Sequence, residues 1–427
     1  MFREMSLTVT QIKQQIKDPL YRNSLFLMAN TIVTSALGFF FWMVVARFYT
    51  EKEVGLGAAI ISAVSFLALI SELGLGIALI RFLPKAEKPV EMINSCFTLS
   101  GIVALAVAGI FIAGLDLWSP SLVFIRYDVM FILVFVLFSL GSALSGIMVC
   151  IFIAKRRADF ALAKNTIVSL LKIPLPILLA VFFHAFGIVS SWGIAFGVAA
   201  AVSLFLFLPR VQKGYHPIPK LNLGIIKDVW RYAIGNYFAS LFAAASGFIL
   251  PIMIVNLVGA EQNAYFYVAW RIAGGLLTIP MSVSQSLFAE GSHFEDKLGV
   301  NVRRSFRFIF LLLIPAIALL LLLGKWILLL FGASYSENTL TLLWILSLSS
   351  LFVGVNRVYA TILRVQGKVR ELVLISGFLT LAVLLGSYFT VPETGITSVG
   401  YSWIAAQGAV SVYVLFALRS SYLAKHS

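Results

Sequence analysis

Long apolar stretches separated by short polar segments recur along the whole chain. Each stretch is long enough to cross a bilayer core of roughly 30 Å as an α-helix, which takes about 20 residues. Helices are predicted rather than membrane strands, because the apolar runs are continuous and lack an alternation of period two. We expect twelve spans, at residues 24–46, 54–80, 93–115, 129–153, 165–183, 188–208, 228–256, 264–285, 305–330, 339–363, 371–390 and 397–418.

Composition agrees with a membrane protein and excludes other classes. Of the 427 residues, 60% are hydrophobic and only 12% are charged, against roughly 25% charged residues in an ordinary soluble domain. A compact soluble fold could not hide this much apolar surface, and the same composition excludes disorder. The only cysteines are Cys96 and Cys150, too few for a disulfide scaffold. The expected fold class is therefore an all-α integral membrane protein.

The positions of the basic residues predict the orientation. A net charge of +14 would suggest nucleic acid as the partner of a soluble protein. With the N-terminus placed inside, however, 25 of the 32 Lys and Arg residues lie in connecting segments on that side, whereas the opposite side holds only Arg47, Lys52, Arg126 and Lys325. This asymmetry is typical of cytoplasmic loops. It predicts a multi-pass protein of the cell (plasma) membrane with both termini in the cytoplasm, whose basic charge meets lipid head groups and no nucleic acid.

A polar segment rich in Pro and Lys, residues 209–227, interrupts the hydrophobic rhythm. We interpret it as a cytoplasmic linker between an N-lobe of six helices (24–208) and a C-lobe of six helices (228–418). A cytoplasmic amphipathic segment (1–23) would precede the lobes and a cytoplasmic tail (419–427) would follow them.

The two halves resemble each other at an offset of about 209–211 residues; for example, the short outer loop at 50–53 matches residues 260–263. Six spans per half give both halves the same orientation in the membrane. Such a parallel repeat is typical of alternating-access transporters, which hold their substrate between two lobes. We expect a monomeric transporter.

The sequence shows no constellation typical of an enzyme. None of the four histidines has a metal-ligand companion at helical spacing, and no phosphate-binding loop is present. We therefore predict no catalytic residue and no metal site. Glu51 and Glu53 in the first external loop are similar to the acidic motif of membrane glycosyltransferases, but we favour their interpretation as solvated loop charges. The glycine pairs Gly55/Gly57 and Gly74/Gly76 are interpreted as sites of close helix packing.

Four charged residues fall inside the predicted spans: Glu72, Lys172, Arg271 and Arg357. A charge at the bilayer centre costs about 2.5–3.5 kcal/mol on insertion scales, so such residues indicate a functional site. Three cations against one acid favour a cavity for an anionic substrate. A buried ion pair or a side chain that snorkels to the interface is the alternative for each cation. Glu72 could bind a coupling H+ or Na+, pair with one of the cations, or stay a neutral acid; no other cofactor is expected.

Three segments carry a resemblance to a known family. They read Ser71-Glu72-Leu73-Gly74-Leu75-Gly76-Ile77-Ala78-Leu79-Ile80-Arg81-Phe82-Leu83-Pro84, Ala264-Tyr265-Phe266-Tyr267-Val268-Ala269-Trp270-Arg271 and Phe331-Gly332-Ala333-Ser334-Tyr335. They resemble the acid-Leu-Gly-Leu-Gly…Arg-Phe-Leu-Pro, Tyr-x-x-Ala-x-Arg and Phe-Gly-x-x-Tyr segments of the polysaccharide flippases. These flippases form the Wzx/RfbX-like branch of the MOP (multidrug/oligosaccharidyl-lipid/polysaccharide) superfamily, which is related to the MATE exporters. The order of the motifs along almost the whole chain also resembles that family.

The resemblance implies two six-helix lobes around a MATE-like, V-shaped cavity. It implies a cargo of undecaprenyl- or dolichyl-linked oligosaccharide, whose phosphate or pyrophosphate meets cationic residues in the cavity. Arg271 matches the arginine position of the family's eighth span, whereas Lys172 and Arg357 match no motif. The chain departs from many relatives at Asn263-Ala264-Tyr265, where they have an acid followed by Val-Gly-x-Tyr.

We therefore predict a flippase that moves a lipid-linked oligosaccharide from the inner to the outer leaflet, for cell-surface polysaccharide or glycoprotein biosynthesis. Polysaccharide assembly enzymes are candidate partners beside the lipid-linked cargo and the bilayer. A MATE-like, ion-coupled exporter of small amphipathic compounds is the second hypothesis, and an integral-membrane glycosyltransferase is the third.

The topology can be tested by labelling single cysteines in a background without Cys96 and Cys150. Cysteines placed in 116–128 and 332–338 should react with an impermeant maleimide on intact cells, because both segments are predicted to face outward. Cysteines in 209–227 should react only after the cells are permeabilised. Labelling of this linker from outside intact cells would overturn the predicted orientation.

Overall fold

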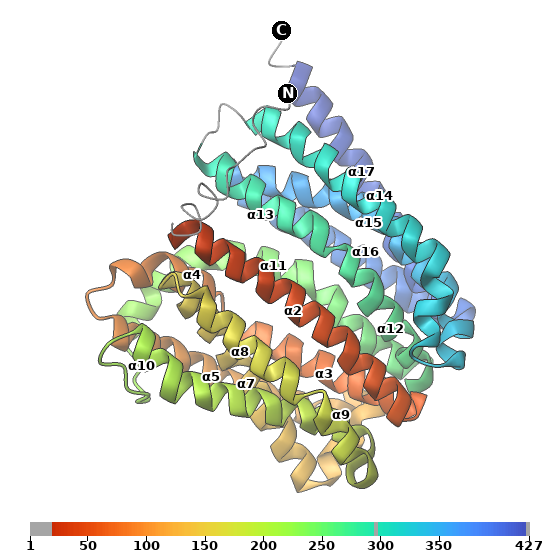
Figure 1. The fold of residues 1–427 in the computed structure, drawn as a ribbon, viewed down its shortest axis with the longest axis horizontal. Coiled ribbons are helices and arrows are strands. Elements are labelled where there is room, and N and C mark those ends of the chain that lie inside the picture. The colour runs from red at the N-terminus through yellow and green to blue at the C-terminus, as the bar shows by residue number, and fades with distance from the viewer. Residues whose placement is uncertain (1–18, 294–297, 424–427) are drawn as a thin grey trace, which may run out of the picture.

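The computed structural model describes residues 19–293 and 298–423, and these residues are almost entirely helical, with no strand among them (Figure 1). The N-terminal bundle contains α2 (Pro19–Phe48), α3 (Glu51–Ser71), α4 (Leu75–Phe82), η1 (Leu83–Lys85), α5 (Pro89–Ala113), α6 (Leu115–Trp118), η2 (Pro120–Tyr127), α7 (Val129–Ala154), α8 (Ala158–Leu171), α9 (Pro174–Val202), η3 (Ser203–Phe207) and α10 (Leu208–Val211). The C-terminal bundle contains α11 (Leu223–Leu257), α12 (Ala260–Leu276), α13 (Thr278–His293), α14 (Leu298–Leu329), α15 (Ala333–Val365), α16 (Val369–Thr394) and α17 (Thr397–Leu423). Most of the predicted amphipathic segment (1–18) and the end of the tail (424–427) lie outside the described residues.

Within the described ranges, eleven helices are long and apolar enough to cross a membrane, and the bent pair α12–α13 makes twelve if it counts as one span. The all-α, multi-pass prediction is thereby confirmed. The fifth and sixth spans are separate segments, Ala158–Ala180 and His184–Val211, and the backbone breaks at His184 (φ 44°, ψ −135°). The fifth span begins seven residues earlier than the predicted 165.

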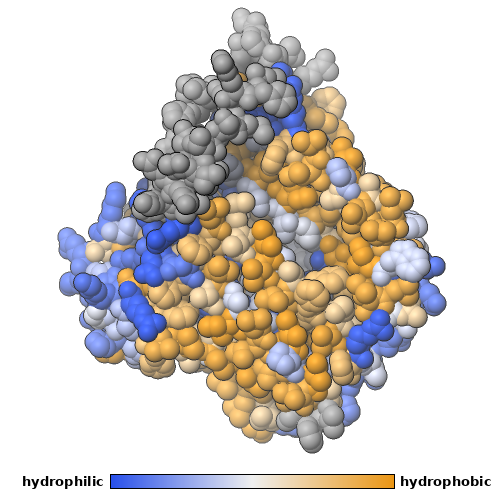
Figure 2. Space-filling model, in the orientation of Figure 1, coloured by the Kyte–Doolittle hydropathy of each residue, from blue (hydrophilic) through white to orange (hydrophobic). Residues whose placement is uncertain are grey.

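The surface has the polarity of a membrane protein. Figure 2 shows one face covered with apolar side chains, whereas hydrophilic side chains gather toward two opposite borders of that face. Large apolar side chains such as Ile32, Leu322 and Phe416 are about two-thirds exposed or more. In water such a surface would aggregate, but in a bilayer the lipid tails cover it.

The two bundles lie side by side in Figure 1 and repeat the same helix order. The second helix of each bundle starts at Glu51 and at Ala260, which is 209 positions later, and the third at Pro89 and Leu298, again 209 positions later. The second helix of each bundle is also broken. The chain bends by 41° between α12 and α13, and α3 is separated from α4 by residues 72–74.

The break after α3 corrects the predicted continuous span 54–80. Leu73 and Gly74 both have positive φ, 49° and 73°, a left-handed conformation that ends a helix. Gly74 therefore belongs to a helix break, and the prediction that it lies inside a helix is wrong. Glu72 is the capping residue at the end of α3.

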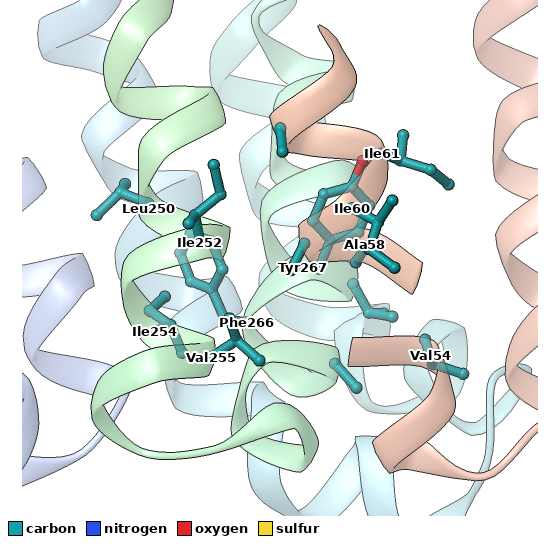
Figure 3. Packing of buried hydrophobic residues seen from close by; sticks show 14 of the residues in the cluster. Val54, Ala58, Ile60, Ile61, Leu250, Ile252, Ile254, Val255, Phe266 and Tyr267 are labelled. Carbon is teal, nitrogen blue, oxygen red and sulfur yellow. The ribbon is translucent and has the colours of Figure 1, made fainter. Parts of the chain in front are cut away.

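The bundles are joined where α3 packs against α11 and α12. Apolar side chains fill this junction: Figure 3 shows Phe266 beside Ile252 and Val255 of α11, and Tyr267 beside Ile60 and Ile61 of α3. All six side chains are at least nine-tenths buried. The junction forms a continuous hydrophobic core across the two bundles.

Backbones approach most closely at the end of the molecule where α3 and α12 begin, which we call the closed end. A Cβ atom at Gly55 would lie 1.7 Å from the carbonyl oxygen of Ala260, so only glycine fits there, as the packing interpretation of Gly55 required. Asn263 donates a 2.7 Å hydrogen bond to the carbonyl oxygen of Gly55. Asn263 belongs to the segment that departs from the family pattern, and here its side chain links the two bundles.

Arg47 adds a polar link between the bundles at the closed end. From the end of α2 its guanidinium donates hydrogen bonds of 2.7 and 2.8 Å to the carbonyl oxygens of Leu329 and Leu330. These carbonyls belong to the C-terminal end of α14, where free carbonyl groups and the helix dipole favour a cation.

We expect Arg47→Ala to loosen the closed end, because the mutation removes both hydrogen bonds between the bundles. Spin labels on cysteines at Lys52 and Lys325, which are exposed on the two bundles at this end, should show a longer or broader distance distribution. Arg126→Ala is the matched control, because Arg126 contacts Asp116 within the N-terminal bundle. Unchanged distances in Arg47→Ala would show that the link does not hold the bundles together.

Candidate ligand-binding cavity

A cavity of about 350 Å³ lies between the bundles and is formed mainly by the C-terminal bundle. Its walls come from α3, α9, α11, α12, α15, α16 and α17. In the same orientation as Figure 1, the space-filling view shows a hollow between the two halves of the apolar face, with paler and blue side chains inside (Figure 2). We call the cavity between the bundles the basic cavity.

Three arginines line the basic cavity: Arg271 on α12, and Arg357 and Arg364 on α15. Arg357 and Arg364 are seven residues apart, so they lie on one face of α15 at a separation of about 10 Å along its axis. Arg271 is the twelfth residue of α12, about 16 Å from the start of that helix and near the middle of a bilayer core of roughly 30 Å. The arginines are thus spread from the end of α15 to mid-membrane depth.

These arginines have no counter-charge in the described part of the chain. No Asp or Glu lines the basic cavity, and none of the three guanidinium groups forms a salt bridge or hydrogen bond with a described residue. The nearest aromatic contact of Arg271 is the ring of Tyr267, whose centroid is 6.0 Å away. Glu72 does not form the ion pair with Arg271 that was one of the predicted alternatives, because Glu72 lines a different cavity.

Arg271 faces the gap between the bundles. Its side chain is exposed although it lies at mid-membrane depth, and a Cβ atom on Gly38 of α2 would lie 3.7 Å from its Nη2 atom. The small residue on α2 therefore leaves room beside the guanidinium. A cation that is open to a cavity and unpaired favours an anionic ligand.

Aromatic and amide groups complete the basic cavity. Trp270 and Trp403 pack edge to face at 4.8 Å between ring centroids. Asn356, next to Arg357, donates hydrogen bonds to Oε1 (2.7 Å) and to the carbonyl oxygen (3.0 Å) of Gln407, which joins α15 to α17. The cavity thus combines apolar ring faces with a few well-placed polar groups, as ligand sites usually do.

A second cavity, of about 420 Å³, lies mainly in the N-terminal bundle, and we call it the N-cavity. It shares four lining residues with the basic cavity, which are Ser65, Trp192, Ala244 and Phe248. The two cavities therefore adjoin.

Two residues of opposite charge, Glu72 and Lys164, line the N-cavity. Lys164 is only 2% exposed, whereas Glu72 is partly buried.

Lys172 packs against aromatic side chains beside the cavities. It is 6% exposed and is not among the residues that line either cavity. Its ammonium nitrogen lies 4.7 Å from the ring centroid of Trp192 and 5.3 Å from that of Phe41. The structure thus brings Arg271 and Arg357 together, whereas Lys172 lies behind the aromatic wall.

Sequence reasoning missed Arg364 and Lys164. Both were assigned to cytoplasmic segments, because the predicted spans ended at 363 and began at 165. The helices continue to Val365 and begin at Ala158. The one available signal was the spacing of seven residues between Arg357 and Arg364, which places both on one helix face.

Residues 44–340 match the protein family described as polysaccharide biosynthesis protein. The chain belongs to this family. Among curated proteins, none matches the chain. The fold is similar to that of MOP superfamily transporters of known structure, at identities low enough that the likeness concerns the fold alone.

One such structure is the inward-facing conformation of a multidrug resistance MATE family transporter, with a TM-score of 0.70 and 16% identity, covering 92% of this chain and 96% of the other. Another is the lipid II flippase MurJ in an inward closed conformation, with a TM-score of 0.72 and 13% identity, covering 92% and 87%. A MOP superfamily transporter from Pyrococcus furiosus has a TM-score of 0.66 and 15% identity, covering 98% and 99%. The MATE-like fold is thereby confirmed, and the family match at residues 44–340 confirms the resemblance to the polysaccharide family.

We expect Arg271→Ala and Arg357→Ala to leave the thermal unfolding midpoint of the purified protein unchanged or higher, because neither side chain has a partner to lose. Asn356→Ala is the matched control beside Arg357, and it should lower the stability by about 1–3 kcal/mol, since it leaves buried groups of Gln407 without a donor. A clear destabilisation in both arginine variants would indicate a structural role for these residues.

Proposed function

We propose that this protein is a flippase that moves a lipid-linked oligosaccharide from the inner to the outer leaflet for cell-surface polysaccharide or glycoprotein biosynthesis. The observation that carries the proposal is the basic cavity, whose three arginines form no ion pair with a described acid and extend from the end of α15 to Arg271 at mid-membrane depth. Membership of the polysaccharide biosynthesis family supports it. So does the similarity of the fold to that of the lipid II flippase.

The cargo's phosphate or diphosphate would bind to the arginines. A guanidinium group can donate two parallel hydrogen bonds to phosphate oxygens, and it stays charged in an apolar environment better than an ammonium group does. Arg271 would hold the phosphate at mid-membrane depth, where no water is at hand to replace it. Arg357 and Arg364 would attract the phosphate along α15.

The shape of the molecule supports alternating access. The bundles are in close contact at the closed end, through Gly55, Asn263 and Arg47. If both termini are cytoplasmic, as the distribution of Lys and Arg predicts, the closed end faces outward and this state receives cargo from the inner leaflet. Opening of the closed end and closure of the other end would then release the cargo to the outer leaflet.

A single chain contains both bundles and the whole basic cavity, so we propose that the transporter acts as a monomer in the plasma membrane. Polysaccharide assembly enzymes would take over the cargo at the outer face.

The MATE-like fold also supports the second candidate, an exporter of small amphipathic compounds. The charge of the basic cavity disfavours cationic drugs as its substrates, because the lining cations would repel them. We infer that the protein is not a glycosyltransferase. Glu53, one of the two acids that would serve that reaction, forms a capping box with Thr50 at the start of α3 and lies 2.8 Å from Nδ1 of His184.

Deletion of the gene should cause a lipid-linked glycan to accumulate on the cytoplasmic leaflet. Wild-type protein should restore export, Arg271→Lys should restore part of it because the charge remains without the planar fork, and Arg271→Ala should lose most of it. Arg307→Ala, an exposed arginine on α14, is the control and should restore export fully. Deletion without accumulation would refute the flippase, and full export by normally expressed Arg271→Ala would refute the phosphate site.

A further inference from the structure

The N-cavity has no role in the binding of phosphate, yet it adjoins the basic cavity through Ser65, Trp192, Ala244 and Phe248. Its volume of about 420 Å³ is within the range of roughly 300–1,000 Å³ that is usual for small-molecule sites. A ligand anchored by its phosphate at Arg271 can therefore extend into the N-cavity. We propose that the N-cavity is a glycan subsite that binds the first sugar beside the phosphate, with Glu72 and Lys164 as its specificity-determining residues. This inference rests on the proposed function.

The polar groups of the N-cavity suit a ligand that both donates and accepts hydrogen bonds. Ser142, Ser145, Asn165, Glu72 and Lys164 come from α3, α7 and α8. Within the described residues, Glu72 and Lys164 form no salt bridge with each other although they line the same cavity. Sugar hydroxyl groups can donate to the carboxylate and accept from the ammonium group at the same time, so one sugar ring can satisfy both charges.

Lys164 is held in place by its neighbours. Its ammonium group donates to the carbonyl oxygen of Ser145 at 3.2 Å and to Oδ1 of Asn165 at 3.1 Å. Asn165 in turn donates to Oδ1 of Asn30 at 2.9 Å, which ties α8 to α2. Two of the three ammonium protons are thus used, and one is left for a ligand.

Glu72 is placed by two backbone features. It ends α3 at the break before α4, and its carboxylate lies against Gly146 of α7, where a Cβ atom would come within 1.8 Å of Oε1. No described residue donates a hydrogen bond to this carboxylate. Its lone pairs are therefore free to accept from ligand O–H or N–H groups.

Trp192 supplies an apolar wall that both cavities share. Lys172 lies near its ring on one side (4.7 Å), and Phe196 packs against it with the ring centroids 5.8 Å apart. These contacts hold the indole ring in one orientation, so that an apolar face of a sugar ring can pack on it next to the phosphate site. Lys172 thus helps to position Trp192.

Together the two charges suit a neutral sugar. A neutral hexose or N-acetylhexosamine offers hydroxyl and amide donors to Glu72 and hydroxyl acceptors to Lys164.

The test compares the binding of two probes to purified protein in nanodiscs: a short-chain polyprenyl diphosphate and the same lipid carrying one N-acetylglucosamine. Wild type should bind the sugar-bearing probe roughly tenfold more tightly or better, the factor expected from one hydrogen bond to a charged group. Glu72→Gln and Lys164→Met should each lose most of this gain and keep the affinity for the bare probe. Glu87→Gln, an exposed acid after α4, should behave as wild type.

The outcomes separate the subsite from the proposed function. Equal affinities of wild type for both probes would overturn the glycan subsite but not the phosphate site, provided that Arg271→Ala still weakens both. Binding of neither probe would refute both proposals. If Glu72→Gln stops transport while both affinities stay unchanged, Glu72 is a coupling residue for H+ or Na+ and the subsite assignment is wrong. A fall in the affinity of Glu72→Gln or Lys164→Met for both probes would also overturn the subsite assignment, because that result would indicate a structural role for the substituted residue.

Discussion

The close approach of α3 to α12 is the contact on which the arrangement of the two bundles depends. At Gly55 the backbones come so near that any side chain would collide with the carbonyl oxygen of Ala260, and Asn263 donates across the same contact. The apolar core between α3, α11 and α12 extends from this point toward the cavities. The bundles also meet along α11, where Tyr237 donates a 3.0 Å hydrogen bond to the carbonyl oxygen of Ile70. The basic cavity lies in the space between the bundles that these contacts leave open, and the N-cavity adjoins it from within the N-terminal bundle.

The low dielectric constant of the membrane interior makes unpaired charges in this space energetically costly. An arginine without a partner at this depth is costly, and a fold that only needed stability would replace it by an apolar side chain. Arg271, Arg357 and Arg364 nevertheless share one cavity and have no acid among its lining residues. Their cost is best explained by a ligand that brings the negative charge. The phosphate-bearing lipid proposed above meets this condition, and its apolar part would fit the aromatic walls.

Breaks in the second helix of each bundle place the charged residues. The α3–α4 break puts Glu72 at a helix end beside Gly146, and the bend between α12 and α13 follows six residues after Arg271. The breaks come after 21 residues in α3 and after 17 residues in α12, and the charged residues beside them differ in sign. The C-terminal bundle thus presents cations, whereas the N-terminal bundle presents a carboxylate with a lysine. In the proposed function, this difference would let one ligand be held by its phosphate on one side and by its sugar on the other.

The sequence by itself determined the membrane-spanning class, the helix order and the repeat, because apolar runs of the length of a bilayer and the period of the helix are local properties. It also identified Glu72, Arg271 and Arg357 as costly charges. Only the tertiary structure decided which of them meet: it grouped Arg271 with Arg357 and Arg364, and Glu72 with Lys164, and it placed Lys172 behind Trp192. Such groupings depend on where helices break and how they pack, and neither is encoded in the hydrophobicity of one segment. The helix ends also had to be known. The predicted end at 363 was two residues short and the predicted start at 165 was seven residues late, so Arg364 and Lys164 counted as loop charges and not as cavity charges.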